Sequence, residues 1–360
     1  MIKYIGSKRL LVPAIAAVAR TLPDARTALD LFAGTTRVSQ CLKRAGLEVR
    51  ANDTASYSEV LARCYIEADA RVVAPKAVEG LLSHLSALPG SPGYFTETFC
   101  VRSRYLHPKN GARVDAIREE IDRLGLDPAM RAVALTSLLE AADRVDSTTG
   151  LQMAYLKDWA PRALGDLELR APRMLPGQGT ASREDANTLV RRIDRVDLAY
   201  VDPPYNQHSF FGNYHVWESL VRNDHPAVYG VACKRVDCRE NRSAYNSRRG
   251  FGPALEELLA NLKARYVLLS CNSEGYLDPA EAGRLLERFG SVGVLEVDFK
   301  RYVGAQIGIH NPKGEKVGRV SHLRNREYLV LAGADGDGVD RALAAAVAVH
   351  EGARPMRLPG

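Results

Sequence analysis

In the first 70 residues, apolar and polar positions follow two patterns, one typical of strands and one typical of amphipathic helices. Residues 28–34 (ALDLFAG) form an apolar run that ends in glycine, and residues 47–53 (LEVRAND) alternate before an acid, so both predict strands. Residues 9–20, 38–46 and 58–68 have the spacing of amphipathic helices. Strand and helix alternating over so short a stretch predict a βαβ unit, and therefore a parallel sheet.

The pattern then becomes helical and later returns to strands. Helices are expected at 73–88, 111–125 and 128–145, separated by turn-rich pieces such as PGSPG. After them we expect a connecting helix at 253–264, an Ala-rich helix at about 339–350, and strands at 196–202, 266–272, 292–299 and 327–333. The sheet is therefore split in the sequence by a helical insertion.

This organisation suggests a division of the chain into a two-part sheet domain, an insertion and a tail. The expected ranges are 1–72 and 185–334 for the two parts of the catalytic domain, 73–184 for the insertion, and 335–360 for a C-terminal helix and tail. A chain of 360 residues is long enough for one large domain or two associated ones.

Composition narrows the class of protein. The net charge of +6 is compatible with an anionic partner, although solubility alone would also explain it. The six cysteines include no CxxC pair, which argues against a disulfide framework or a zinc site and favours a reducing compartment. The N-terminus is a poor signal peptide, and no apolar run approaches the roughly 20 residues of a membrane span.

Three acids lie at the carboxyl ends of expected strands, where open α/β sheets bind ligands: Asp30, Asp53 and Asp202. The turn DLFAGTT (30–36) lacks both GxGxxG and the P-loop pattern, so a dinucleotide fingerprint and a phosphate cradle are not indicated. Asp53 has the position of an acid that receives ribose hydroxyls, because a carboxylate accepts hydrogen bonds from a cis-diol. A helix N-cap is the alternative for this residue.

The stretch VDPPYN (201–206) joins an acid to an aromatic ring through two prolines. Proline has no N–H for a sheet ladder, so the strand must stop and the next residues are stiff. The result is either a rigid platform at a strand end or an ordinary Pro-rich turn with a solvated Asp202. Near the N-terminus, KYIGSK (3–8) precedes a helix and could hold a carboxylate through Lys8, or could be a frayed basic end.

Taken together and in this order, KYIGSK, DLFAGTT, AND and DPPYN resemble the class-α, Dam-like adenine-N6 DNA methyltransferases, and most closely the FokI-type modification methyltransferases. Segments 202–220 and 302–331 are also similar to that pattern, so the resemblance covers about residues 1–333. Thr36 departs from the family's FxGxG. The resemblance implies a Rossmann-like S-adenosylmethionine-dependent methyltransferase sheet with helices on both faces and an inserted helical target-recognition subdomain.

The resemblance also implies residue roles. Asp202 and the Pro203 carbonyl would accept the hydrogens of the target amine, Pro204 would stiffen this segment, and Tyr205 would stack on a flipped-out adenine. Asp53 would hold the cofactor's ribose and Asp185 its adenine amino group, while Lys8 would lie near its carboxylate. Asp202 would also contact the cofactor, because it would lie between the cofactor and the target amine. The remaining expected cofactor contacts are Tyr4, Asp30, Phe32, Ala33 and Gly34. The product would be S-adenosylhomocysteine, and no metal is expected.

Two basic stretches are candidates for DNA contact, 232–250 and 300–326, the second reading as a hairpin around NPKGEK. Either could instead be a solvated loop. The expected contacts are Lys234, Arg235, Arg239, Arg242, Arg248, Arg249, Lys300, Arg301, Lys316 and Arg319. By analogy with the family, the insertion would read the target sequence, with 102–113 and 143–150 as contact loops.

The sequence therefore predicts a site-specific methyltransferase acting on the N6 amine of adenine in double-stranded DNA, with a restriction endonuclease or alone. Its expected place is the cytoplasm, with the nucleoid, and a monomer is favoured over a dimer. A cytosine-N4 DNA methyltransferase or an RNA adenine methyltransferase on the same scaffold is the alternative, although cytosine-N4 enzymes tend to carry serine where this chain has Asp202. A catalytically silent DNA-binding protein is a further alternative, against which the intact motif residues argue.

Overall fold

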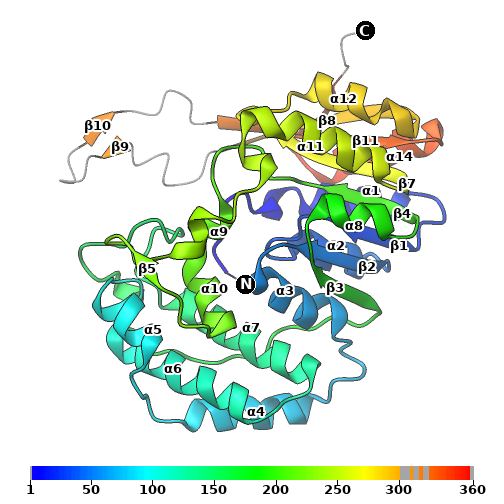
Figure 1. Ribbon diagram of the computed structural model, residues 1–360. Helices are drawn as coiled ribbons and strands as arrows, with labels where there is room; N and C mark the ends of the chain where they lie inside the picture. The colour runs from blue at the N-terminus through cyan, green and yellow to red at the C-terminus, as the bar shows by residue number, and fades with distance from the viewer. Residues whose placement is uncertain (1, 301–308, 311–315, 319–323, 357–360) are drawn as a thin grey trace.

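The computed structural model describes residues 2–300, 309–310, 316–318 and 324–356. In this part of the chain the centre is an eight-stranded sheet in the order β12-β8-β11-β7-β4-β1-β2-β3 (Figure 1). Strands β1, β2, β3, β4 and β7 run parallel, and β11 lies antiparallel to both β7 and β8. The strands are β1 (Thr27–Asp30), β2 (Glu48–Asp53), β3 (Gly179–Arg183), β4 (Val196–Val201), β7 (Ala264–Asn272), β8 (Ser291–Lys300), β11 (Arg324–Gly333) and β12 (Ala353–Met356).

The parallel register brings the carboxyl ends of three strands to one edge. Asp30 of β1 lies opposite Ala51 of β2 and Tyr200 of β4. Because β2 and β4 continue only to Asp53 and Val201, all three strand ends open on the same side. The expectation that Asp30, Asp53 and Asp202 meet at one edge follows from this register.

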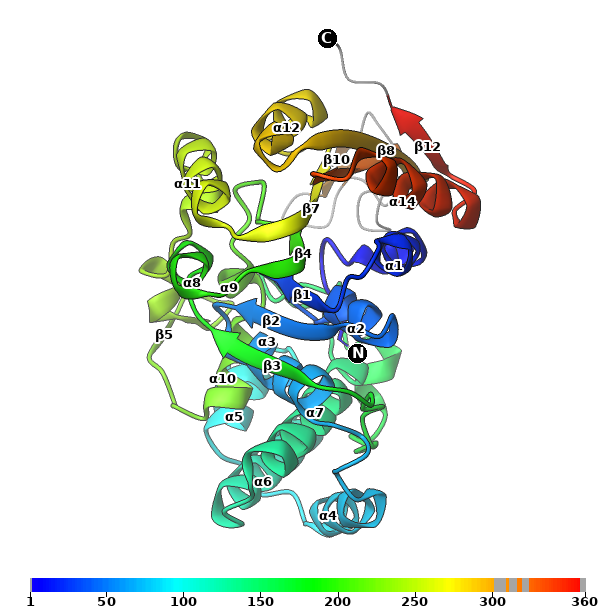
Figure 2. The ribbon, with the colours of Figure 1, turned by 90° about the vertical axis from the view of Figure 1, so that its right-hand side faces the viewer.

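Helices cover both faces of the sheet (Figure 2). Neighbouring residues of β4 separate two hydrophobic clusters, because strand side chains alternate between faces: Tyr200 joins one cluster and Val201 the other. The first face carries α1 (Val12–Thr21), α2 (Arg37–Arg44), α3 (Ser56–Ala62) and α14 (Gly336–Val349). The second carries α8 (Ala186–Arg192), α11 (Arg248–Asn261) and α12 (Pro279–Leu286).

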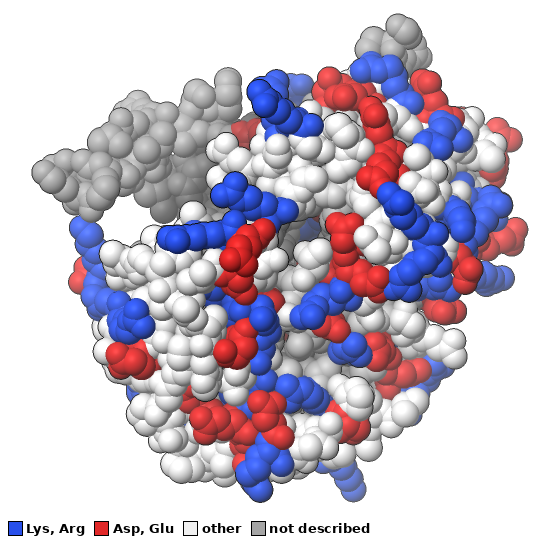
Figure 3. Space-filling model, in the orientation of Figure 1, with Lys and Arg blue, Asp and Glu red and all other residues white. Residues whose placement is uncertain are grey.

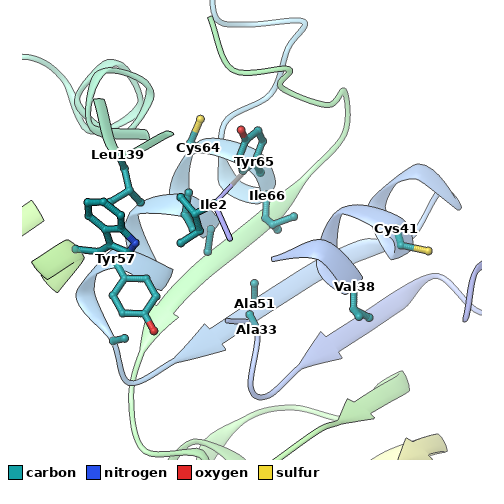
Figure 4. Packing of buried hydrophobic residues seen from close by; sticks show 14 of the residues in the cluster. Ile2, Ala33, Val38, Cys41, Ala51, Tyr57, Cys64, Tyr65, Ile66 and Leu139 are labelled. Carbon is teal, nitrogen blue, oxygen red and sulfur yellow. The ribbon is translucent and has the colours of Figure 1, made fainter. Parts of the chain in front are cut away.

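The helical insertion shares its core with the first face of the sheet. Leu139 of the insertion belongs to the same buried cluster as Ile2, Tyr57 and Ile66 (Figure 4). Such continuity holds the insertion firmly against the catalytic sheet. Its helices are α4 (Pro75–Ala87), α5 (Tyr94–Thr96), α6 (Pro108–Arg123) and α7 (Pro128–Arg144).

Short elements complete the described chain. Helices α9 (Phe210–Asn213) and α10 (His215–Arg222) follow β4, and β5 (Val228–Tyr229) pairs with β6 (Lys234–Arg235). The short strands β9 (Ile309–His310) and β10 (Lys316–Gly318) pair antiparallel, as the expected hairpin requires. Two short π-helical segments are Arg63–Glu67 and Glu97–Val101. Short 3-10 helices are Lys8–Leu10, Pro161–Leu164, Val236–Arg239, Ala244–Asn246 and Glu287–Phe289.

The expected fold class is confirmed, but two strands of the sheet were missed, β3 and β12, and β12 lies in the range expected to hold only a helix and tail. β3 lies within 73–184, the range expected to be the insertion, yet it pairs with β2 in the main sheet. Its sequence, GTASR, is only half-buried at the edge of the sheet and carries no apolar alternation. No helix in the described part of the chain is both long and apolar enough to cross a membrane.

Candidate active site

A cavity of about 340 Å³ opens at the carboxyl edge of the sheet. It brings together residues from six separate parts of the chain: the N-terminal segment, the β1–α2 turn, the end of β2, the start of α8, the segment after β4 and residues 240–246. Of the residues expected from the sequence, those lining it are Tyr4, Phe32, Gly34, Asp53, Asp185, Asp202, Pro203, Pro204 and Tyr205. Lys8, Asp30 and Ala33 line an adjoining recess instead.

Gly34 forms the floor where the β1–α2 turn meets the N-terminal segment. Its φ is +50°, and a Cβ there would lie 3.1 Å from the ring of Tyr4. Glycine is therefore favoured here for two reasons: it tolerates the positive φ, and it leaves space for the ring of Tyr4. The ring of Tyr4 stacks on that of Tyr214 at 4.5 Å between centroids, so the N-terminal segment is fixed beside the turn.

Asp53 is held by backbone amides on both oxygens. Oδ2 accepts the N–H of Gly34 at 2.8 Å, and Oδ1 accepts the N–H of Ala55 at 3.0 Å. Burial raises the pKa of this carboxyl, and the backbone hydrogen bonds oppose that effect. Each oxygen keeps a second lone pair for a donor in the cavity, so the arrangement suits hydroxyl groups of a ligand.

Asp30 is the most deeply buried acid of the set, with 1% of its surface exposed. Oδ2 accepts the hydroxyl of Ser39 at 2.5 Å, whereas Oδ1 has no hydrogen-bond partner among the described residues. Burial raises its pKa to about 7, opposed by Ser39 and reinforced by the nearby Asp202 and Asp53. An unsatisfied buried carboxylate oxygen is costly, so this atom fits a cationic donor supplied by a ligand.

The segment from Asp202 to Tyr205 is a rigid jaw, as the sequence predicts for two prolines after a strand. Pro203 is buried, and the carbonyl of Tyr205 accepts the N–H of Tyr276 at 3.0 Å. Gly275 makes room for Tyr205, since a Cβ at residue 275 would lie 3.2 Å from that of Tyr205. The side-chain amide of Asn246 fixes the residues that follow the jaw, because it donates hydrogen bonds to the carbonyls of Asn206 and His208.

Lys8 makes two ion pairs that the sequence did not predict. Its Nζ is 3.1 Å from Oδ1 of Asp202 and 3.1 Å from Oε2 of Glu327 on β11, so two protein carboxylates occupy it. Burial lowers the pKa of Lys8, but Asp202 and Glu327 outweigh burial and hold this pKa well above its ordinary value. These ion pairs place Lys8 beside Asp202, and its expected position near a cofactor carboxylate stays a prediction.

Asp202 is tuned by the same two neighbours. Burial raises its pKa to about 6, with the Lys8 ammonium opposing and the Glu327 carboxylate reinforcing the shift. Oδ1 of Asp202 forms an ion pair with Lys8 but accepts no hydrogen bond from the residues that the structure describes, so it still has the capacity to accept one. Glu327 had no role in the sequence interpretation, although it lies within the motif-like segment 302–331.

The cavity has an aromatic wall that the sequence interpretation placed in a DNA-contact loop. Tyr245 meets Phe32 edge-on, with 5.2 Å between ring centroids, and its hydroxyl donates to Asn187 at 2.7 Å. Residues 240–243 and 245–246 line the cavity. Asp185 lies on this side, where Oδ1 accepts the N–H of Thr188 as the N-cap of α8.

The expected DNA-contact residues fall into three groups: residues at the described surface, residues outside the described part of the chain, and Arg235, which is buried. Arg239, Arg242, Arg248 and Arg249 are exposed, Lys234 is half-buried, and Arg239 stacks over the ring of Tyr229. Arg301 and Arg319, together with the side chains of Lys300 and Lys316, lie outside the described residues. In Figure 3, basic and acidic side chains are interspersed on the face that is hollowed near its centre.

Arg235 must be removed from the group of DNA contacts. Its side chain is 1% exposed and pairs with Asp224 at 2.7 Å and Asp237 at 2.8 Å. Both ion pairs are made inside the protein, where the guanidinium holds the β5–β6 hairpin in place and is not accessible to a phosphate.

Comparison with known proteins agrees with this geometry. Residues 4–277 match the family model of the D12 class N6 adenine-specific DNA methyltransferases. The type II methyltransferase M.NlaIII of Neisseria lactamica is 31% identical over 340 residues, which cover 90% of this chain and 99% of that protein. The modification methylase StsI of Streptococcus sanguinis is 30% identical over 325 residues, and the type II methyltransferase M.FokI of Planomicrobium okeanokoites 28% over 323.

The coverage of these relatives differs. The match takes in 85% of this chain but 49% of StsI, and 83% of this chain but 49% of M.FokI. The chain thus spans about half the length of these two relatives and nearly the whole of M.NlaIII.

Proposed function

The chain belongs to the D12 class of N6 adenine-specific DNA methyltransferases, as its ordered motifs predicted, and we propose that it methylates the N6 amine of adenine at a specific site in duplex DNA. The observation that carries the proposal is the jaw from Asp202 to Tyr205. It presents a carboxylate, a backbone carbonyl and an aromatic ring to one cavity at the carboxyl edge of the sheet.

The residues present fit S-adenosylmethionine. Asp53 would hold the ribose, Asp185 the adenine amino group, and Asp30 the ammonium of the methionine group through its unpartnered Oδ1. Tyr4, Phe32, Ala33 and Gly34 would line the same ligand. When bound, this cofactor supplies a methyl group that is already activated by its sulfonium, so the protein needs no covalent nucleophile.

The task left to the protein is to orient and activate a weak nucleophile. The adenine amine is weak because its lone pair is delocalised into the ring. Asp202 would accept one amine hydrogen and the carbonyl of Pro203 the other, which favours a pyramidal nitrogen and fixes its direction of attack. Lys8 holds the Asp202 carboxylate ionised and in place, and Glu327 holds Lys8.

Tyr205 would stabilise the target base outside the duplex. An adenine inside the helix cannot reach a cavity of this kind, so the base must be flipped out. Stacking of a base on an aromatic ring is worth roughly 1–3 kcal/mol. The ring of Tyr205 lines the cavity, and Lys8 Nζ lies 5.3 Å from its centroid, which further fixes the ring.

The exposed arginines at residues 239, 242, 248 and 249 would contact DNA phosphates, and the helical insertion would read the sequence. We propose that the protein acts as a monomer in the cytoplasm, on nucleoid DNA. The names of M.NlaIII and M.FokI as type II methyltransferases support a pairing with a restriction endonuclease.

A methyl-transfer assay with isotopically labelled S-adenosylmethionine tests this proposal. The purified protein is incubated with a random-sequence duplex DNA pool and, separately, with RNA of the same sequences. We expect label in duplex DNA and none in RNA. Label in RNA alone would overturn the proposed substrate while leaving the methyltransferase family intact.

A further inference from the structure

A small recess adjoins the main cavity and contains two opposite charges that do not pair with each other. It shares Tyr4, Phe32, Gly34 and Asp202 with the cavity, so a ligand could extend from one to the other. Its own lining includes Asp30 and the first residue of α2, Arg37. None of the roles assigned above uses Arg37.

Arg37 is a half-buried cation that has no acidic partner among the described residues. No hydrogen bond or ion pair joins it to any described residue, and its buried Nε has no acceptor. Burial lowers its pKa, and the nearby positive charge of Arg9 lowers it further. A guanidinium that is partly buried beside another cation is costly, and an anion in the recess would relieve that cost.

The backbone around Arg37 is also unusual. Thr36, immediately before it, has a φ of +60°, a conformation that residues other than glycine rarely adopt. Strain of this kind persists only where the surrounding structure imposes it, and it is typical of ligand-binding turns. The strained Thr36 sets the start of α2 and thereby the side chain of Arg37 at the rim of the recess.

Two side chains of this recess, one acid and one cation, form no ion pair where the structure describes the chain, and together they suit a ligand that carries an ammonium and a carboxylate close together. Oδ1 of Asp30 has no hydrogen-bond partner in the described part of the chain and suits the ammonium. Lys8, the residue expected to meet the carboxylate, is already held at 3.1 Å by both Asp202 and Glu327. Arg37, the other cation of the recess, forms no ion pair with a carboxylate of any described residue.

We propose that Arg37 binds the carboxylate of the cofactor's methionine group and thereby makes the protein selective for the intact amino acid end of its cofactor. This inference rests on the proposed function, because it assumes S-adenosylmethionine in the cavity. A guanidinium can bind a carboxylate through two parallel hydrogen bonds, which fixes orientation as well as affinity. The assignment leaves Lys8 to Asp202 and Glu327.

Calorimetric binding of two ligands tests the proposal without turnover. The ligands are S-adenosylmethionine and its decarboxylated analogue, which keeps the amine and lacks only the carboxylate. For Arg37→Gln we expect the affinity for S-adenosylmethionine to fall about 10- to 100-fold, the loss typical of charge-assisted hydrogen bonds. The affinity for the decarboxylated analogue should stay as in the wild type, so the variant loses the preference between the two ligands.

A matched control is available on the same helix. Arg44→Gln removes the same charge from an exposed arginine in the last turn of α2, whose contact is with Gln40, and should bind both ligands as the wild type does. Equal losses for both ligands in Arg37→Gln would show a structural role and overturn the proposal. Unchanged affinity for S-adenosylmethionine would overturn it too, while leaving the proposed function standing. A wild-type protein that binds neither ligand would refute the proposed function itself.

Discussion

Nζ of Lys8 lies 3.1 Å from Oδ1 of Asp202, although 194 residues separate them in the chain (202 − 8). The pair connects the N-terminal segment directly to the jaw after β4. Glu327 lies 3.1 Å from the same Nζ, so β11 also joins this connection. The three side chains form a buried cluster with two carboxylates and one ammonium, so each sets the charge and direction of the others.

Lys8→Met and Glu327→Gln should shift the pH dependence of methylation in opposite directions. Asp202 must be ionised to accept the amine hydrogen, and its pKa is raised to about 6, so activity should fall as pH drops through that value. Loss of the Lys8 charge raises the pKa of Asp202 and moves the acid limb of kcat/KM to higher pH. Loss of the Glu327 charge lowers that pKa and moves the limb to lower pH.

The pH–rate profiles of both variants measure these shifts. Glu296→Gln is the control, because Glu296 on neighbouring β8 pairs with Arg354 and should leave the limb unchanged. Shifts of the same sign in Lys8→Met and Glu327→Gln would contradict the arrangement.

Tyr205→Phe and Tyr205→Ala should separate stacking from hydrogen bonding. The phenylalanine ring keeps the stacking surface, so this variant should retain most of kcat/KM. The alanine variant should lose about 10- to 100-fold, which corresponds to roughly 1–3 kcal/mol of base–aromatic stacking. Steady-state kinetics on one duplex oligonucleotide gives both values, and equal losses would refute a stacking role.

Asp53→Ala should weaken binding of S-adenosylhomocysteine, because the variant loses the acceptors for ribose hydroxyls. A loss of about 10-fold or more is expected from hydrogen bonds to a charged group. Glu48→Ala, an exposed acid at the start of the same strand, should bind normally. Calorimetry measures both affinities, and thermal unfolding checks that loss of the bonds to Gly34 and Ala55 has not unfolded the variant. An unchanged affinity in Asp53→Ala would remove this residue from the cofactor site.

Charge reversal of Arg248 and Arg249 together should weaken DNA binding and reduce its salt dependence, because two exposed cations at the start of α11 would no longer displace counterions. Arg20→Glu is the control, since this exposed residue lies in the last turn of α1, near the amino end of β1 and away from the cavity. Fluorescence anisotropy at several salt concentrations measures the slope. A slope equal to that of the wild type would show that these arginines are merely solvated.

Much of the fold followed from hydrophobic periodicity, because most strands of the sheet are buried on both faces and its helices have one apolar face. β3 could not be found in this way, since GTASR lies at the sheet edge and its burial does not alternate. The helix expected at 58–68 also ends earlier, at Ala62, and continues as the π-helical segment Arg63–Glu67.

The site was predictable where it depended on parallel strand ends, and not where it depended on distant pairing. Asp53 and Asp202 were found because each lies at the carboxyl end of an expected strand. The partner of Lys8 was not, because Glu327 lies 319 residues away on an antiparallel strand whose register the sequence does not reveal. The burial of Arg235 was missed for the same reason, since a cluster of charges does not show which of them pair with Asp224 and Asp237.

The most direct test of adenine methylation is nucleoside mass spectrometry of duplex DNA treated with S-adenosylmethionine and either the wild-type protein or Asp202→Ala. We predict N6-methyladenine with the wild type and none with the variant, and calorimetry should show that the variant still binds the cofactor. N4-methylcytosine in place of N6-methyladenine, or equal N6-methyladenine from both proteins, would contradict the role assigned to the jaw at Asp202.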